Sequence, residues 1–131
     1  MSTESFDTYT NPKTLLGSIG RNHRYIKALL QSKAKIIKKV QQIMDDKARS
    51  KTPFNKSQQR VFTEFTGVYA KEGGKLKKAL KRIEHLQSIL HNETEPAPLE
   101  LSLLLMQRHQ NSAITSLRRM IASATATLEE L

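Results

Sequence analysis

The sequence predicts an all-α fold, an elongated antiparallel three-helix bundle with coiled-coil-like packing. Three long stretches repeat apolar residues at alternating steps of three and four, which is the pattern of a helix with one buried face. Two short polar breaks that contain proline separate these stretches. The 131 residues include only five glycines and four prolines, which favours long helices over a sheet.

The first helix is predicted over residues 13–49. Its apolar series is Leu16, Ile19, His23, Ile26, Leu30, Lys33, Ile37, Val40 and Met44. His23 falls on this series, so we expect a buried histidine there and not a metal ligand. After Ser50 the chain offers Thr52 as an N-cap and Pro53 as the first residue of the next helix.

The second helix is predicted over residues 53–91. Its series is Phe62, Phe65, Tyr69, Glu72, Leu76, Ala79, Ile83, Leu86 and Leu90, with Glu72 the one member out of character. The series keeps its phase across Gly73 and Gly74, so we expect one continuous helix with a soft point, although each glycine costs about 1 kcal/mol relative to alanine. Two shorter helices joined by a turn are the alternative.

The third helix is predicted over residues 98–130, after a polar break that includes Pro96 and Pro98. Its series is Leu99, Leu103, Met106, Gln110, Ala113, Leu117, Met120, Ala124, Thr127 and Leu131. Residues 1–11 are predicted to be a flexible tail, and 12–131 a single domain. Short connections make consecutive helices antiparallel, so residue i of the second helix is expected opposite roughly residue 190 − i of the third.

The charge is strongly positive and unevenly placed. The chain has 22 Lys and Arg against 12 Asp and Glu, a net charge of +10. Residues 21–82 hold eighteen of the bases and only four acids. This imbalance suggests an anionic partner, whether nucleic acid, a lipid headgroup or an acidic protein, and a simply solvated exterior is the alternative.

Antiparallel pairing is expected to bring cations of all three helices together, with Arg108 near Arg82. The residues predicted to bind a polyanion are Arg21, Arg24, Lys27, Lys75, Lys77, Lys78, Lys81, Arg82, Arg118 and Arg119. Aromatic residues are few and the sequence contains no groove-reading motif, so phosphate contacts without sequence readout are expected.

The third helix has more apolar and small surface than one buried face requires. Outside its main series lie Leu101, Leu104, Leu105, Ala122 and Ala126. We therefore expect these residues to mediate self-association or to contact a protein partner; the alternatives are packing of the N-terminal tail through Phe6 and Tyr9, or a third helix that is simply well buried.

No catalytic, cofactor or metal motif is present in the sequence. There is no cysteine, the four histidines lack ligand spacing, and adjacent carboxylates such as Asp45 and Asp46 diverge by about 100° on a helix. We expect no enzyme activity, no cofactor and no small-molecule substrate. Without a secretory signal or an apolar run of about 18 residues, a cytoplasmic location is expected, with a nuclear one as an alternative and no role at a membrane.

These features predict a non-enzymatic helical binding protein whose basic face contacts a polyanion, with nucleic acid as the first hypothesis. The third helix would mediate self-association or partner binding. The alternative is a structural, adaptor or chaperone-like subunit of a protein assembly, without a role in nucleic-acid binding.

Overall fold

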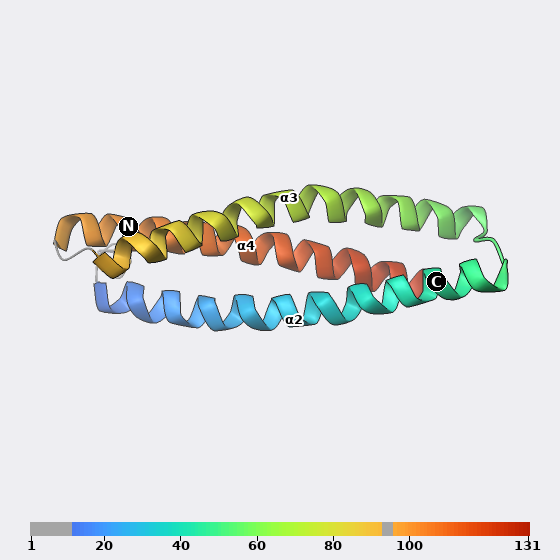
Figure 1. Cartoon of the computed structure of the whole chain (residues 1–131), viewed down its shortest axis with the longest axis horizontal. Coiled ribbons are helices and arrows are strands. Elements are labelled where there is room, and N and C mark those ends of the chain that lie inside the picture. The colour runs from blue at the N-terminus through green and yellow to red at the C-terminus, as the bar shows by residue number, and fades with distance from the viewer. Residues whose placement is uncertain (1–11, 93–95) are drawn as a thin grey trace, which may run out of the picture.

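The computed structural model describes residues 12–92 and 96–131, and it confirms the predicted all-α three-helix bundle. The helices are α2 (Pro12–Ser50), α3 (Lys56–Asn92) and α4 (Pro96–Glu130). They lie alongside one another as an elongated rod, and α3 runs in the opposite direction to α2 and α4 (Figure 1). The predicted flexible tail, residues 1–11, lies outside the described residues.

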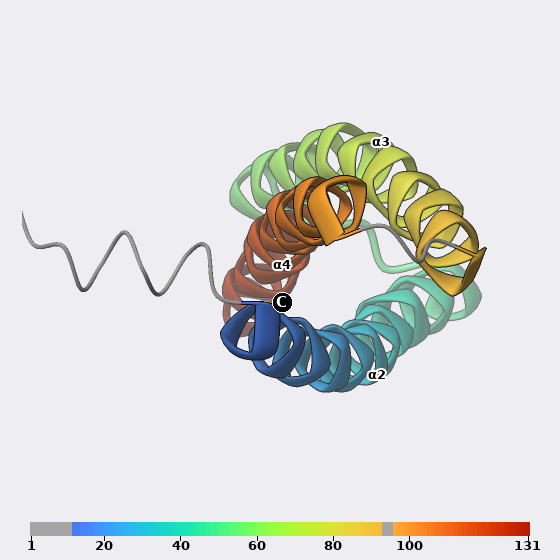
Figure 2. The same cartoon turned by 90° about the vertical axis from the view of Figure 1, so that its left-hand side faces the viewer.

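α4 is the helix on which the other two pack. It contacts both α2 and α3 extensively, whereas the backbones of α2 and α3 scarcely approach each other. Viewed along the rod, the three helices wind around a common axis (Figure 2). Two side-chain bonds hold α2 beside α4: Gln107 Nε2 donates to Ser18 Oγ at 2.8 Å, and Gln110 Nε2 donates to the Ile19 carbonyl at 3.1 Å.

Burial follows this arrangement. The α4 positions with at most 1% exposure are Leu103, Met106, Gln110, Ala113, Leu117, Met120, Ala124 and Thr127. These are eight consecutive members of the predicted α4 series. In the α2 series only Ile26 and Val40 are fully buried, and α2 makes fewer contacts with α4 than α3 does.

The prediction that His23 is buried is wrong, because its side chain is exposed. Since α2 and α3 stay apart, members of both apolar series remain accessible: Leu16 is 56% exposed and Tyr69 is 38% exposed.

The first turn differs from its predicted form. α3 begins at Lys56 and not at residue 53, and its cap is Asn55 and not Thr52. Asn55 Oδ1 accepts from the Gln58 backbone N–H at 2.8 Å, and Gln58 Oε1 accepts from the Asn55 N–H at 3.2 Å. This reciprocal pair is a capping box, which satisfies two N–H groups where a threonine cap satisfies one.

Lys51 and an aromatic row complete the turn. Lys51, directly after α2, takes a left-handed conformation with φ of 55°, which reverses the chain direction. Phe54 stacks on Phe62 with ring centroids 6.2 Å apart, and Lys47 lies 5.6 Å over the Phe54 ring. At the other end of the rod, α4 begins at Pro96, two residues before the predicted start; proline is well tolerated in a first helical turn because its missing N–H would be unpaired there.

α3 runs without interruption through Gly73 and Gly74, as the phase of its apolar series predicted. No glycine of the described residues has a positive φ. A Cβ at Gly74 would meet nothing within 4 Å, and one at Gly73 would lie 3.9 Å from Met120 Cε. Neither glycine is required by the helix geometry.

Gly74→Ala is therefore expected to raise the free energy of unfolding by about 0.5–1 kcal/mol, because alanine restricts the unfolded chain and favours the helix. Urea denaturation followed by far-UV circular dichroism measures the change. Gly73→Ala is the matched control: its Cβ gains an ordinary contact with Met120, so a similar gain is expected. A loss of stability in Gly74→Ala would contradict the unstrained helix described at this position.

Candidate polyanion-binding groove

A groove of about 650 Å³ runs between α3 and α4 on the outer side of the rod. We call it the basic groove because five cations line it: Lys75, Lys78, Arg82, Arg108 and Arg119. The imidazole of His109 lines it as well. No acidic side chain is among its lining residues. Two separate helices therefore supply positive charge to one depression.

The spacing of these cations follows from helix geometry. Lys75, Lys78 and Arg82 are three and four residues apart, which places them on one side of α3. On α4, Arg108 and Arg119 are eleven residues apart, or about 16 Å along the axis. Uncharged hydrogen-bonding side chains, including Asn111, Ser112 and Thr115, lie along the groove between them. The groove thus offers cations along its length and neutral donors in between.

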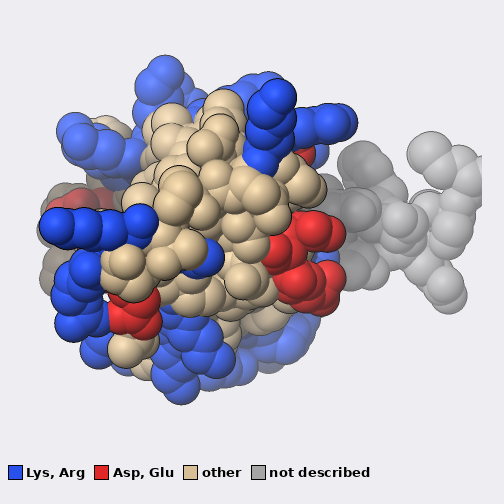
Figure 3. All heavy atoms as spheres, turned by 90° about the vertical axis from the view of Figure 1, so that its right-hand side faces the viewer, with Lys and Arg blue, Asp and Glu red and all other residues tan. Residues whose placement is uncertain are grey.

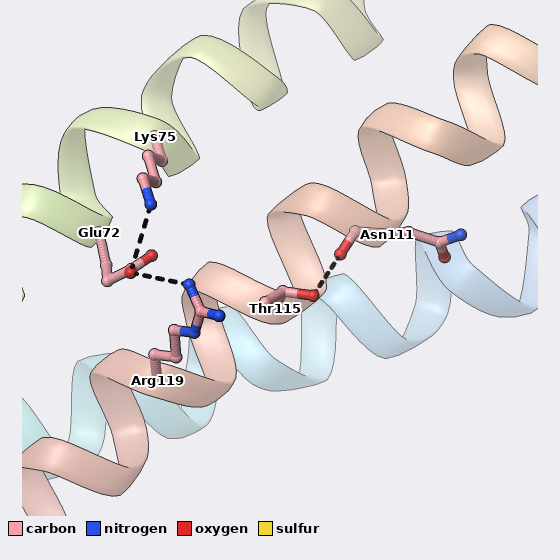
Figure 4. A network of polar contacts seen from close by, with 5 residues as sticks. All are labelled: Glu72, Lys75, Asn111, Thr115 and Arg119. Carbon is pink, nitrogen blue, oxygen red and sulfur yellow. Dashed lines mark hydrogen bonds and ion pairs between the residues drawn. The ribbon is translucent and has the colours of Figure 1, made fainter.

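One cation of the groove is held by a buried carboxylate. Glu72 is only 4% exposed, and its Oε1 lies 3.2 Å from Arg119 Nη1 and 3.8 Å from Lys75 Nζ. The side chain points from α3 toward α4, where the Arg119 guanidinium reaches it (Figure 4). Nearby, the Thr115 hydroxyl donates to the Asn111 carbonyl at 2.9 Å. Glu72 therefore fixes one end of the Arg119 side chain beside the groove.

The charge of Glu72 is stabilised in spite of its burial. Burial alone would raise the pKa of this carboxyl, but hydrogen bonding from Ser116 and Arg119, together with the positive charges of Lys75 and Arg119, lowers its pKa below the ordinary value of 4.5. Glu72 stays ionised at neutral pH and is already compensated, so it adds little repulsion toward an anion in the groove.

His109 lines the same groove from α4 and is half-buried. Burial lowers the pKa of its imidazole below the ordinary value of 6.5, and the positive charges of Arg82 and Arg108 lower it further. His109 is therefore neutral at pH 7 and reports the local positive potential.

The structure divides the sequence-predicted cations among several surfaces. Lys75, Lys78, Arg82 and Arg119 line the basic groove. Arg108 was expected near Arg82 but was not included in the predicted site, and it lines the groove as well. The remaining six predicted cations are exposed but do not line it: Arg21, Arg24, Lys27, Lys77, Lys81 and Arg118.

Two of these residues have identified surroundings elsewhere. Arg118 Nε donates to the Tyr25 hydroxyl at 2.8 Å and its guanidinium lies 5.3 Å over the Tyr25 ring, which ties α4 to α2. Lys27 lines a different groove, between α2 and α3. The other four are solvent-exposed positions on α2 and α3.

The predicted partner interface on α4 falls into two parts. Leu101 is 61% exposed, Leu105 is also exposed, and Leu104 is half-buried beside the basic groove. Ala122 and Ala126 are exposed further along the same helix. The leucines and alanines are separated by the cationic middle of α4, so they do not form one continuous apolar surface.

The ion pair between Glu72 and Arg119 was not predicted, although the sequence carries two signals for it. Glu72 is the single acid on the apolar series of its helix, and the antiparallel register places it opposite roughly residue 118. An acid on a buried stripe requires a cation from the facing helix. The combination of the two signals identifies Arg119 or its neighbour.

The wider surface agrees with the positive net charge. Seen from the end that carries the first turn, Lys and Arg side chains project around most of the perimeter, whereas Asp and Glu gather in small patches (Figure 3). Within residues 12–92 and 96–131, no group of three or more His, Asp or Glu is arranged to hold a metal ion. None of the described helices combines the length and apolar character that crossing a membrane requires.

The chain matches no protein-family model, and no curated protein or solved structure is significantly similar to it. Functional inference therefore depends on the geometry and chemistry of its own surfaces.

Glu72→Gln is expected to lower the free energy of unfolding at pH 7 by about 1 kcal/mol, since it removes charge-assisted hydrogen bonds while Arg119 remains partly hydrated. Because the pKa of Glu72 is lowered by folding, its contribution is present above pH 4.5 and is lost as the pH falls below that value. Urea denaturation of both proteins from pH 7 downward measures the difference. A difference that stays constant to the most acidic pH would show that the carboxylate charge is not involved.

The pKa of His109, followed by NMR of its ring protons, is expected to lie below 6.5 in the free protein. Arg82→Gln should raise it, because one of the two cations that oppose imidazolium formation is removed. Addition of polyphosphate should also raise it by neutralising the same charges. An unchanged pKa in Arg82→Gln would mean that these side chains do not lie as close as the structure places them.

Proposed function

We propose that this protein is a non-enzymatic helical binding protein whose basic groove contacts the phosphate backbone of nucleic acid. The observation that carries the proposal is the convergence of five cations from two helices on one groove whose lining includes no acid. The nearest buried carboxylate, Glu72, is already paired with Arg119 and Lys75.

Electrostatics favours a polyanion over a single small anion. The cations along the groove repel one another, and binding a series of phosphates relieves this repulsion over about 16 Å of α4. Each neutralised phosphate also releases condensed counterions. With five such contacts, log K is expected to fall with log salt concentration with a slope of roughly −3 to −5.

The lining residues support binding that is independent of base sequence. No Phe, Tyr or Trp side chain is among the described residues that line the basic groove, so the large stacking platforms typical of base recognition are not part of it. Asn111 and Ser112 offer hydrogen bonds to phosphate or sugar oxygens. Such contacts position a backbone without reading its bases.

A structural, adaptor or chaperone-like subunit of a protein assembly is the second candidate. It is favoured by the exposed leucines at the start of α4, where Leu101 is 61% and Leu105 is 37% exposed. Isolated exposed leucines are common on monomeric proteins, so this observation is weaker than the convergence of cations in the basic groove.

Fluorescence anisotropy with a labelled, mixed-sequence oligonucleotide of about 16 nucleotides tests the first candidate. Affinity is expected to fall on the order of 10²-fold between about 50 and 200 mM salt. The double variant Lys78→Glu, Arg82→Glu should bind at least about tenfold more weakly, because it reverses two charges in the groove and leaves the Glu72 ion pairs in place.

The matched control is Lys35→Glu, Lys39→Glu. It makes the same change in net charge at two exposed α2 positions that do not line the basic groove, and should lose less than about threefold. Equal losses in the two variants would show that overall charge and not the groove drives binding. If the protein does not bind the oligonucleotide at about 50 mM salt, the hypothesis of a structural, adaptor or chaperone-like subunit is favoured.

A further inference from the structure

A second groove, of about 310 Å³, lies between α2 and α3 and differs in chemistry from the first. We call it the α2–α3 groove. Its apolar lining is Ile26 and Leu30 from α2 with Leu80 and Ile83 from α3, and Gln110 of α4 also lines it. The basic groove is polar and cationic, whereas this one has apolar walls.

The α2–α3 groove exists because the two helices that flank it do not close on each other. Along α2, Leu16, His23, Leu30 and Ile37 are seven residues apart and therefore share one side of the helix. Leu16 is 56% exposed, His23 is exposed, and the other two are only half-buried. Leu30 and Ile37 pack against the core with part of their surface still accessible, so the described residues cover this row only in part.

Gln110 supplies an independent sign of an incomplete interface. Its side chain is 1% exposed, and its Nε2 donates to the Ile19 carbonyl at 3.1 Å. Its Oε1 is buried, and no hydrogen bond to it is found among the described residues. A buried acceptor without a donor is unfavourable, so a donor side chain entering the groove would stabilise this site.

The flanks of the groove are basic. Lys27 lines it. On α3, Lys77 is three residues before Leu80 and Lys81 is three residues before Glu84, so each neighbours a lining residue; both are exposed and outside the basic groove. Glu84 is the one acid among the lining residues. Three of the cations that were predicted from the sequence to bind a polyanion therefore lie beside the α2–α3 groove and not in the basic groove.

We propose that the α2–α3 groove binds an acidic amphipathic α-helix of a partner protein, which completes a four-helix bundle. Apolar residues of such a helix, at steps of three and four, would pack on Ile26, Leu30, Leu80 and Ile83. Its carboxylates would pair with Lys27, Lys77 and Lys81, and one polar side chain would donate to Gln110 Oε1.

Other occupants fit less well. A second copy of this chain carries a net charge of +10 and the same basic flanks, so two copies meeting here would repel each other. A nucleic-acid strand would gain from the flanking lysines but would place its phosphates against an apolar floor that offers them no hydrogen bond. The combination of apolar floor and basic flank matches an acidic amphipathic helix.

A fluorescent designed peptide of about 20 residues serves as the probe, with leucines at helical steps of three and four and glutamates elsewhere. The control peptide has the same composition in an order that destroys the apolar stripe. Full-length protein is expected to bind the amphipathic peptide at least about tenfold more tightly than the control, because only the amphipathic peptide presents an apolar stripe to the groove. The two peptides carry equal charge, so charge attraction alone predicts no difference in affinity. Equal affinity for the two peptides would overturn the proposal and leave only general charge attraction.

Two charge-matched variants separate this inference from the proposed function. Lys27→Glu, Lys77→Glu is expected to weaken peptide binding at least about tenfold and oligonucleotide binding less than about threefold. Lys78→Glu, Arg82→Glu is expected to show the reverse. If both variants lose both ligands equally, the two grooves are not distinct sites and this inference is wrong, whether or not nucleic acid binds.

Because the chain contains no cysteine, single labels locate the peptide directly. An environment-sensitive dye on Gln87→Cys, at the α2–α3 groove, should shift to the blue on peptide addition, and the same dye on Ser112→Cys, at the basic groove, should not. A shift only at Ser112→Cys would overturn the proposal. Sedimentation of the free protein should give a monomer, and a dimer whose formation shifts the Gln87→Cys dye would identify a second copy as the occupant.

Discussion

The structure depends on the apolar contact that α4 makes with both of its neighbours. Its buried row, from Leu103 to Thr127, is shared between α2 and α3, whose backbones scarcely approach each other. The hydrophobic effect therefore acts through one central helix, and α2 and α3 are positioned by their contacts with it. Both grooves follow from this arrangement: one is the junction of α3 with α4, and the other is the space that α2 and α3 leave open.

The fold was largely predictable because a repeat of three and four residues specifies helix and buried face together. Phase alone predicted that α3 continues through Gly73 and Gly74, and the α4 series matches the most deeply buried residues. What periodicity cannot specify is how many neighbours cover a stripe. His23 occupies a core position by phase yet is exposed, and the helix start at Lys56 depended on a reciprocal cap with Gln58 that competes with Thr52 and Pro53.

The candidate site was predictable in part. Charge density pointed to the α3 cations, three of which line the basic groove, and the antiparallel register predicted that Arg82 and Arg108 lie near each other, as the lining of this groove has them. Linear sequence could not distinguish the two edges of α3, since Lys77 and Lys78 are adjacent in the chain but lie about 100° apart around the helix. Glu72 likewise departs from the apolar series of α3, and only the position of Arg119 on the facing helix explains how its charge is accommodated.

α3 forms one wall of each groove, with cations on one edge and leucine and isoleucine on the other. The two sets of lining residues have no side chain in common, although one helix contributes to both. The protein therefore has room for one ligand on each edge of α3 at the same time, with neither competing for the contacts of the other.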